Sequence, residues 1–143
     1  MIHVEVEIEI MQSPEVVFEY ISDFTKNTEW QSGMKESYML TEGPLAVGSR
    51  YAQVASFLGK KIESVFEVTA FEPGKMVNAS SVKSAFPISF SRSVEPSGVG
   101  TLVKTKVEGD PGSYFKIGGF MLRKMVESTI RKDYKKLRKR LSG

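Results

Sequence analysis

The sequence predicts an α+β fold in which a curved, seven-stranded antiparallel sheet wraps around one long C-terminal helix. Three observations predict it. Apolar and polar residues alternate over most of residues 2–108, short turn-prone segments separate the alternating runs, and the period changes to that of an amphipathic helix after residue 112. We expect these elements to form a single domain that covers residues 1–143.

The first strand and two short helices open the chain. Residues 2–10 alternate valine or isoleucine with histidine or glutamate, which is typical of a half-buried strand. Ser13 can cap a helix that has Pro14 in its first turn. Asp23 can cap a second short helix that runs toward Trp30, the only tryptophan. We expect these two helices, between the first and second strands, to cover one end of the sheet.

Six further strands follow, with expected bounds of 35–41, 49–58, 61–71, 76–82, 88–94 and 101–108. Glycine and proline mark the separators, as in Gly59-Lys60 and Pro73-Gly74. Connections this short favour hairpins, so we expect neighbouring strands to be antiparallel.

Residues 113–141 have the spacing of one amphipathic helix. Its apolar positions recur every four or seven residues at Phe115, Leu122, Val126, Ile130, Leu137 and Leu141. Gly118 and Gly119 lie inside this expected helix, where they would allow a close approach to the sheet or mark a bend. One helix cannot fill the concave face of a strongly curved sheet, so we expect a hollow beneath it.

Composition excludes several classes of protein. The 143 residues contain 41% hydrophobic and 26% charged residues, which is typical of a globular protein. Apolar runs are too short to span a bilayer, so we expect no integral membrane association. The alternating, acidic start does not resemble a secretory signal, and the absence of cysteine excludes disulfides and thiolate chemistry. These features favour a cytoplasmic location.

Basic residues are concentrated near the C-terminus, where RKDYKKLRKR contains seven Lys or Arg among ten residues. Such a run could attract nucleic acid, an acidic protein or an anionic lipid surface, which would make the chain an interaction module. We favour a solvated helix face that complements the negative end of the helix dipole. No nucleic-acid partner is therefore predicted.

Several segments together resemble a known superfamily. In chain order they are SPEVVFEYISDFTKNTEWQSG, VGSRY, GKKIESVFEVTAFEPGKMV, VEPSGVGTLVKTKVEG and GGFMLRKMVESTIRKDYKKLRKRL. They resemble the START/Bet v 1-like helix-grip superfamily (SRPBCC), in particular its polyketide cyclase/dehydrase-like branch, over nearly the whole chain. The resemblance implies a sheet that grips the C-terminal helix around an apolar ligand cavity. It leaves activity open, because the superfamily includes carriers, ligand binders and aromatase/cyclases.

Arg92 is the most informative candidate for the cavity. It alternates with serine and shares its strand face with Phe90, so a cation points toward the face that is otherwise apolar. A buried guanidinium needs a partner, because leaving it unpaired costs several kcal/mol. It could anchor a carboxylate or phenolate of a ligand. Alternatively, it could pair with Glu127 of the C-terminal helix or extend to a wet rim.

Other candidates follow from strand parity and from the face that the resemblance suggests is inward. Tyr51 and Gln53 would add a phenol and an amide to the wall, and small hydroxyls among apolar neighbours suit a cavity that holds a few waters. Ordinary packing explains the hydroxyls equally well. The remaining candidate ligand-binding residues are Trp30, Ser64, Phe66, Phe90, Thr105, Phe115, Leu122, Met125 and Val126.

Catalytic signals are sparse. His3, the only histidine, shares its strand face with glutamates and is predicted to point outward. Neither a zinc site, a Cys-His pair nor a phosphate-binding loop is recognisable, so no metal and no cofactor are predicted. No inward acid, histidine or thiol is evident, which disfavours proton-transfer chemistry.

The sequence therefore favours binding or transport of a hydrophobic, lipid-like or polyketide-like molecule between the sheet and the last helix. Trp30 and the short helices would gate the cavity, while Arg92, Tyr51 and Gln53 would orient a polar end of the ligand. The alternative is a polyketide cyclase or dehydratase in which Tyr51 or Arg92 polarises a carbonyl. A monomer and a homodimer both remain open.

Overall fold

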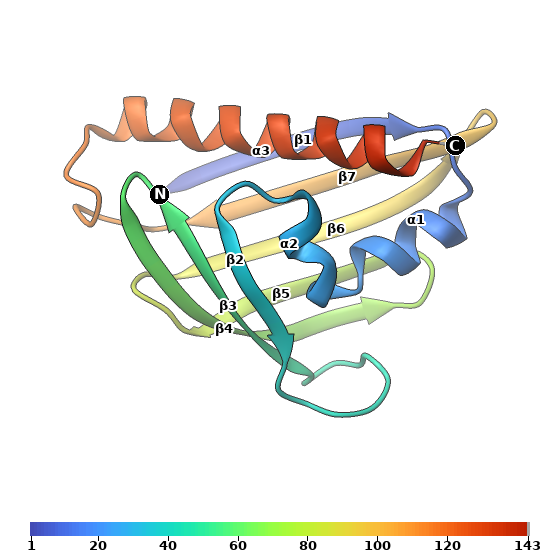
Figure 1. Cartoon of the computed structure of the whole chain (residues 1–143), viewed down its shortest axis with the longest axis horizontal. Helices are drawn as coiled ribbons and strands as arrows, with labels where there is room; N and C mark the ends of the chain where they lie inside the picture. The colour runs from blue at the N-terminus through green and yellow to red at the C-terminus, as the bar shows by residue number, and fades with distance from the viewer. Residues whose placement is uncertain (143) are drawn as a thin grey trace.

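A computed structural model describes residues 1–142 (Figure 1). β1 (Ile2–Ile10) leads into α1 (Pro14–Ile21), a 3₁₀ turn η1 (Phe24–Lys26) and α2 (Asn27–Trp30). The other elements are β2 (Met34–Met39), β3 (Arg50–Phe57), β4 (Lys60–Glu72), β5 (Met76–Lys83), β6 (Ile88–Ser97), β7 (Gly100–Gly109) and α3 (Gly119–Leu141).

The described strands form one seven-stranded antiparallel sheet in the order β1-β7-β6-β5-β4-β3-β2. From β2 to β7, each strand pairs with the next strand in the chain. β1 pairs with β7 and forms one edge of the sheet, and β2 forms the other edge. The sheet curls so that α3 runs along β1 while α1 lies over β6 (Figure 1). The predicted helix-grip architecture, with short helices between strands β1 and β2, is confirmed.

The predicted caps hold the short helices in place. The Ser13 hydroxyl accepts a hydrogen bond of 3.4 Å from the amide of Val16, and the Asp23 carboxylate accepts one of 3.1 Å from the amide of Thr25. The apolar stripe of α1 faces the sheet and is fully or almost fully buried at Val17, Phe18 and Ile21. The helices thus cover the inner face through side chains that the sequence pattern identifies.

The start of the C-terminal helix was predicted wrongly. α3 begins at Gly119, and the expected first turn from residue 113 is a loop. Lys116 has a φ of 53°, in the left-handed region that interrupts a right-handed helix. Gly118 is extended at the N-cap position, so the two glycines mark the start of α3 instead of lying inside it. Phe115 consequently projects from the loop before α3.

Candidate functional site

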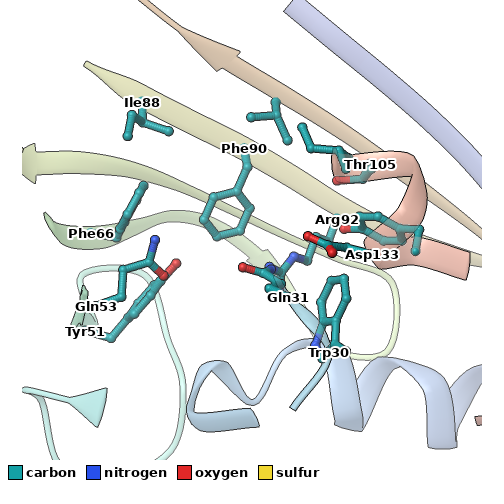
Figure 2. A pocket seen from close by; sticks show the side chains of 13 residues that line it. Trp30, Gln31, Tyr51, Gln53, Phe66, Ile88, Phe90, Arg92, Thr105 and Asp133 are labelled. Carbon is teal, nitrogen blue, oxygen red and sulfur yellow. The ribbon is translucent and has the colours of Figure 1, made fainter. Parts of the chain in front are cut away.

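A cavity of about 160 Å³ lies on the concave side of the sheet, with walls from β3, β4, β6, β7, α3 and the end of α2 (Figure 2). It is lined by Trp30, Gln31, Tyr51, Gln53, Phe66, Ile88, Phe90, Arg92, Thr105, Val107, Ile130, Asp133 and Tyr134. Seven of the predicted binding residues are among these. Two charged side chains, one of each sign, stand in an otherwise mostly apolar and aromatic wall.

Arg92 on β6 is 4% exposed and is held rigidly. Its Nη1 donates to the carbonyl oxygen of Ile21 at 2.8 Å and to Oδ1 of Asn27 at 3.2 Å. The guanidinium carbon also lies 4.9–5.7 Å from three ring centroids, those of Phe24, Trp30 and Phe90. Within residues 1–142, Nε and Nη2 have no hydrogen-bond partner, so two sides of a fixed cation are available to a guest.

The alternative that paired Arg92 with Glu127 is wrong. Glu127 lies 3.9 Å from Arg131, one helical turn further along α3. Arg92 does not reach a wet rim either, because α1 and α2 cover it and supply its two neutral acceptors. No carboxylate of the described chain forms an ion pair with this guanidinium.

Asp133 of α3 is the second charged group of the cavity and was not predicted. Its Oδ1 accepts hydrogen bonds from the amide (3.0 Å) and the hydroxyl (2.6 Å) of Ser32, while Oδ2 has no partner among the described residues. Burial raises the pKa of Asp133 above its ordinary range, although the bonds from Ser32 and the nearby Lys136 and Lys132 oppose this. The cavity therefore contains a carboxyl group with one oxygen still able to interact.

Helical spacing is the signal that could have identified Asp133. Val126, Ile130, Asp133 and Leu137 follow one another at steps of four, three and four residues, so the acid occupies the inward stripe of α3. The lysines and arginines around Asp133 are typical of one solvated helix face, and this interpretation leaves Asp133 outside the predicted site. The lysines and arginines of residues 131–140 are indeed exposed, whereas Asp133, Tyr134 and Leu137 are buried.

Tyr51 supplies an uncharged polar group to the wall. Its ring stacks between Phe24 and Phe66, with centroid distances of 4.2 and 5.4 Å. Burial raises the pKa of Tyr51 above its ordinary value, while the charge of Arg92 opposes the rise. The phenol therefore stays protonated and can donate a hydrogen bond. In Figure 2 Tyr51 and Gln53 lie together on one side of the cavity, and Gln31, Arg92 and Asp133 lie on the other.

A second cavity, of about 190 Å³, lies beside the first toward the N-terminal end of α3. Its lining is almost entirely apolar and includes Ile2, Phe57, Ile62, Phe86, Phe115, Leu122 and Val126. Ile88, Val107 and Ile130 line both cavities, so these three side chains form the partition between them. The two adjoining spaces therefore differ in character, because the first contains charged side chains and the second is apolar.

The structure thus distributes the predicted binding residues over two spaces. Phe115, Leu122 and Val126 line the apolar cavity, and Met125 and Ser64 line neither cavity. Ser64 is buried, and its hydroxyl is hydrogen-bonded to that of Ser84 at 2.8 Å. Trp30 is fully buried against Tyr134, with ring centroids 4.9 Å apart, so it is part of the wall and not an exposed gate.

His3 lies outside both cavities, as predicted. It is exposed on β1 and pairs with Glu5 and Glu108 on the outer face of the sheet. Among residues 1–142 no cluster of three acidic or histidine side chains could hold a metal ion. None of the described helices has both the length and the hydropathy needed to cross a bilayer.

A comparison with protein families shows which family this chain belongs to. A family model described as "Polyketide cyclase / dehydrase and lipid transport" matches residues 1–142. The chain belongs to this family. The predicted relationship is confirmed, although the family description spans both enzymes and carriers. No curated protein matches the sequence.

Solved structures share the fold of this family member at low sequence identity. A protein from Thermus thermophilus has a TM-score of 0.81 and 18% identity, with 97% of this chain and 96% of that chain covered. A START superfamily protein from Mycobacterium smegmatis has a TM-score of 0.80 with the same identity and coverage. Ara h 8.0201 has a TM-score of 0.70 at 13% identity, again covering 97% of this chain and 96% of that chain.

Proposed function

We propose that this protein binds a small hydrophobic molecule that has one polar end. The observation that carries the proposal is the pair of adjoining cavities, one with a fixed, buried guanidinium and the other apolar. The polar end would lie against Arg92 and Tyr51, and the apolar part would pass the partition into the second cavity. Lipid transport in the family description and the START name of one structural neighbour support a binding or carrier role.

The volumes of the two cavities limit the size of the ligand. The two cavities, of about 160 and 190 Å³, are each slightly larger than the roughly 150 Å³ space that accommodates benzene in a protein core. Each is smaller than the roughly 300–1,000 Å³ typical of pockets for drug-sized molecules. We therefore expect a ligand with one ring or a short alkyl chain in each space.

The experiment is a titration with methyl heptyl ketone, followed by the indole N–H signal of Trp30 in proton–nitrogen correlation spectra. Trp30 is the only tryptophan, so this signal reports on the first cavity without ambiguity. Val107→Phe fills the partition, and Val99→Phe adds the same ring to a hairpin position that is 85% exposed. We expect saturable shifts in wild type and Val99→Phe and their loss in Val107→Phe. Absence of saturable shifts in wild type would contradict the proposal.

A second candidate function is cyclisation and dehydration of a poly-ketone, and Asp133 is the observation that favours it. The sequence predicts no acid on the inner face, which disfavours this chemistry. That prediction is wrong, because Asp133 lines the first cavity. Asp133 would take a proton from a methylene between two carbonyls while Arg92 or Tyr51 stabilises the enolate. The enolate carbon then bonds to a second carbonyl carbon, whose oxygen takes the proton back from Asp133 and becomes a hydroxyl. Loss of the remaining proton of the former methylene together with this hydroxyl releases water and forms a carbon–carbon double bond.

Incubation with a linear triketone tests this second function. Formation of the cyclised, dehydrated product would have to exceed the rate without protein and fall at least about 100-fold in Asp133→Asn, as expected for loss of a general base. Asp110→Asn is the matched control, because this carboxylate is 58% exposed and lines neither cavity. A ligand that is bound and released unchanged would leave binding as the function.

A further inference from the structure

The first cavity contains a fixed donor and a fixed acceptor that do not satisfy each other. Arg92 directs Nη1 to Ile21 and Asn27 and retains Nε and Nη2. Asp133 directs Oδ1 to Ser32 and retains Oδ2. Both side chains line the same 160 Å³ space, yet no ion pair joins them.

Both groups are already immobilised by other contacts. Three aromatic rings and two hydrogen bonds hold the guanidinium, and two hydrogen bonds from one residue hold the carboxyl. A ligand that meets them loses little further side-chain entropy, so complementarity to both groups translates into affinity. A group left without a partner in such a space costs binding energy instead.

We infer that this end of the cavity selects an uncharged head group in which a carbonyl oxygen stands beside an N–H or O–H, as in an amide or a hydroxy-ketone. The carbonyl accepts from Arg92 and the N–H or O–H donates to Oδ2 of Asp133. This inference rests on the proposed function, because it assigns the head group of the ligand that the two cavities would hold.

The same geometry disfavours a carboxylate, the head group that a lone buried arginine predicts. One carboxylate oxygen would accept from Arg92, but the other would meet the ionised Asp133 carboxyl, which also offers only acceptors. The charges of Arg92 and Asp133 also sum to zero, so the cavity has no excess positive charge for an anion to neutralise. A simple ketone fits Arg92 but leaves Asp133 without a donor.

Three ligands with similar alkyl chains test the inference on the full-length protein near neutral pH: octanamide, octanoate and methyl heptyl ketone. Dissociation constants come from the Trp30 indole signal. We expect octanamide to bind wild type about tenfold more tightly than either of the others, which corresponds to one additional hydrogen bond.

Asp133→Asn provides the decisive variant. The amide of Ser32 still requires an acceptor, which holds the substituted carbonyl oxygen in the position of Oδ1 and places the NH₂ group where Oδ2 was. The cavity then presents donors on both sides and a net positive charge. We expect the preference to reverse, with octanoate binding more tightly than octanamide. Asp110→Asn makes the same change of net charge at an exposed site, so it retains the wild-type order.

The outcomes separate the inference from the function on which it rests. Saturable binding with octanoate as tight as octanamide in wild type would overturn the inference and leave binding intact. An unchanged order in a folded Asp133→Asn would overturn it as well. If that variant does not fold, the wild-type preference for octanamide over methyl heptyl ketone decides. If none of the three ligands binds wild type, the proposed function fails, and the inference fails with it.

Discussion

A hydrogen bond of 3.2 Å joins Nη1 of Arg92 on β6 to Oδ1 of Asn27 on α2, and both side chains are buried. A second bond from the same nitrogen reaches the last residue of α1, Ile21. One cation of the sheet therefore anchors both short helices that cover it. The cover and the polar end of the cavity are consequently parts of the same structural unit.

Asn27→Leu removes an acceptor of Arg92 and keeps the branched outline of the side chain. We expect the free energy of unfolding to fall by about 1.5–3 kcal/mol, the range for hydrogen bonds to charged groups. Asn78→Leu is the control, because the amide oxygen of Asn78 is buried without a partner and its removal leaves no donor unsatisfied. Urea denaturation measures both variants. A loss in Asn78→Leu as large as that in Asn27→Leu would show that the Arg92 bond contributes nothing specific.

Asp133 makes stability depend on pH. Burial raises its pKa in the folded state, so the folded protein holds this proton more tightly than the unfolded chain does. Ionisation therefore opposes folding, and the contribution of Asp133 to stability declines as pH rises from the ordinary aspartate range through the folded pKa. We expect the unfolding free energy of wild type minus that of Asp133→Asn to decrease over this interval. Urea titrations at several pH values measure the difference, and a rising difference would contradict the burial argument.

The fold could be predicted from the sequence because its signals are local. Strand alternation, glycine and proline turns, and caps such as Ser13 act within a few residues of where they stand. The start of α3 was missed because periodicity continues through Phe115, while the backbone at Lys116 and Gly118 is not helical. Apolar spacing alone does not identify where a helix begins.

The site was predictable where strand parity, helped by the family resemblance, indicates the inner face. Parity placed Arg92 on that face, the resemblance added Tyr51 and Gln53, and all three line the same cavity in the structure. The partners of Arg92 lie 65 and 71 residues away in sequence, and no spacing rule connects them. Cavity volume depends on how side chains such as Ile130 fill the space between elements, which a single sequence does not specify.

Ile130→Ala removes part of the partition between the cavities. We expect a loss of roughly 2 kcal/mol in unfolding free energy, at the low end for Ile→Ala, because Ile130 already borders empty space on two sides. We also expect tighter binding of bulkier ligands, such as naphthalene compared with benzene. Ile117→Ala is the control, since Ile117 is half-buried but lines neither cavity. Calorimetric titration measures the ratio of affinities, and an unchanged ratio would mean that Ile130 does not separate the spaces.

Glu29 links the three helices by accepting from the Tyr20 hydroxyl at 2.6 Å and from Nη2 of Arg140 at 3.2 Å. Burial, followed by the bond and charge of Glu29, raises the pKa of Tyr20 to about 12, whereas Arg140 lowers it. We expect Glu29→Gln to lower this pKa and Arg140→Gln to raise it. Ultraviolet absorbance during alkaline titration measures the shift, with Tyr20→Phe identifying the transition. Shifts of the same sign in both variants would contradict this arrangement.

Gly33 joins α2 to β2 with a φ of 77°, and its carbonyl accepts a hydrogen bond of 2.8 Å from the amide of Ser56. A Cβ at this position would overlap the carbonyl oxygen of Ser56, a backbone atom that cannot move aside alone. Gly43 has a φ of 91° but has open space around it. Gly43→Ala therefore loses only the roughly 1–2 kcal/mol of left-handed strain.

We expect Gly33→Ala to cost more than Gly43→Ala, because it adds displacement of β3 to the same strain. Since Trp30 lies three residues before Gly33, that displacement also moves a wall of the first cavity. Thermal unfolding compares the two variants, and the emission maximum of Trp30 reports the movement of the wall. Equal melting temperatures with unchanged emission would contradict this expectation. They would show that the backbone at Ser56 accommodates the added Cβ without loss of stability, and that the position of α2 does not depend on this contact.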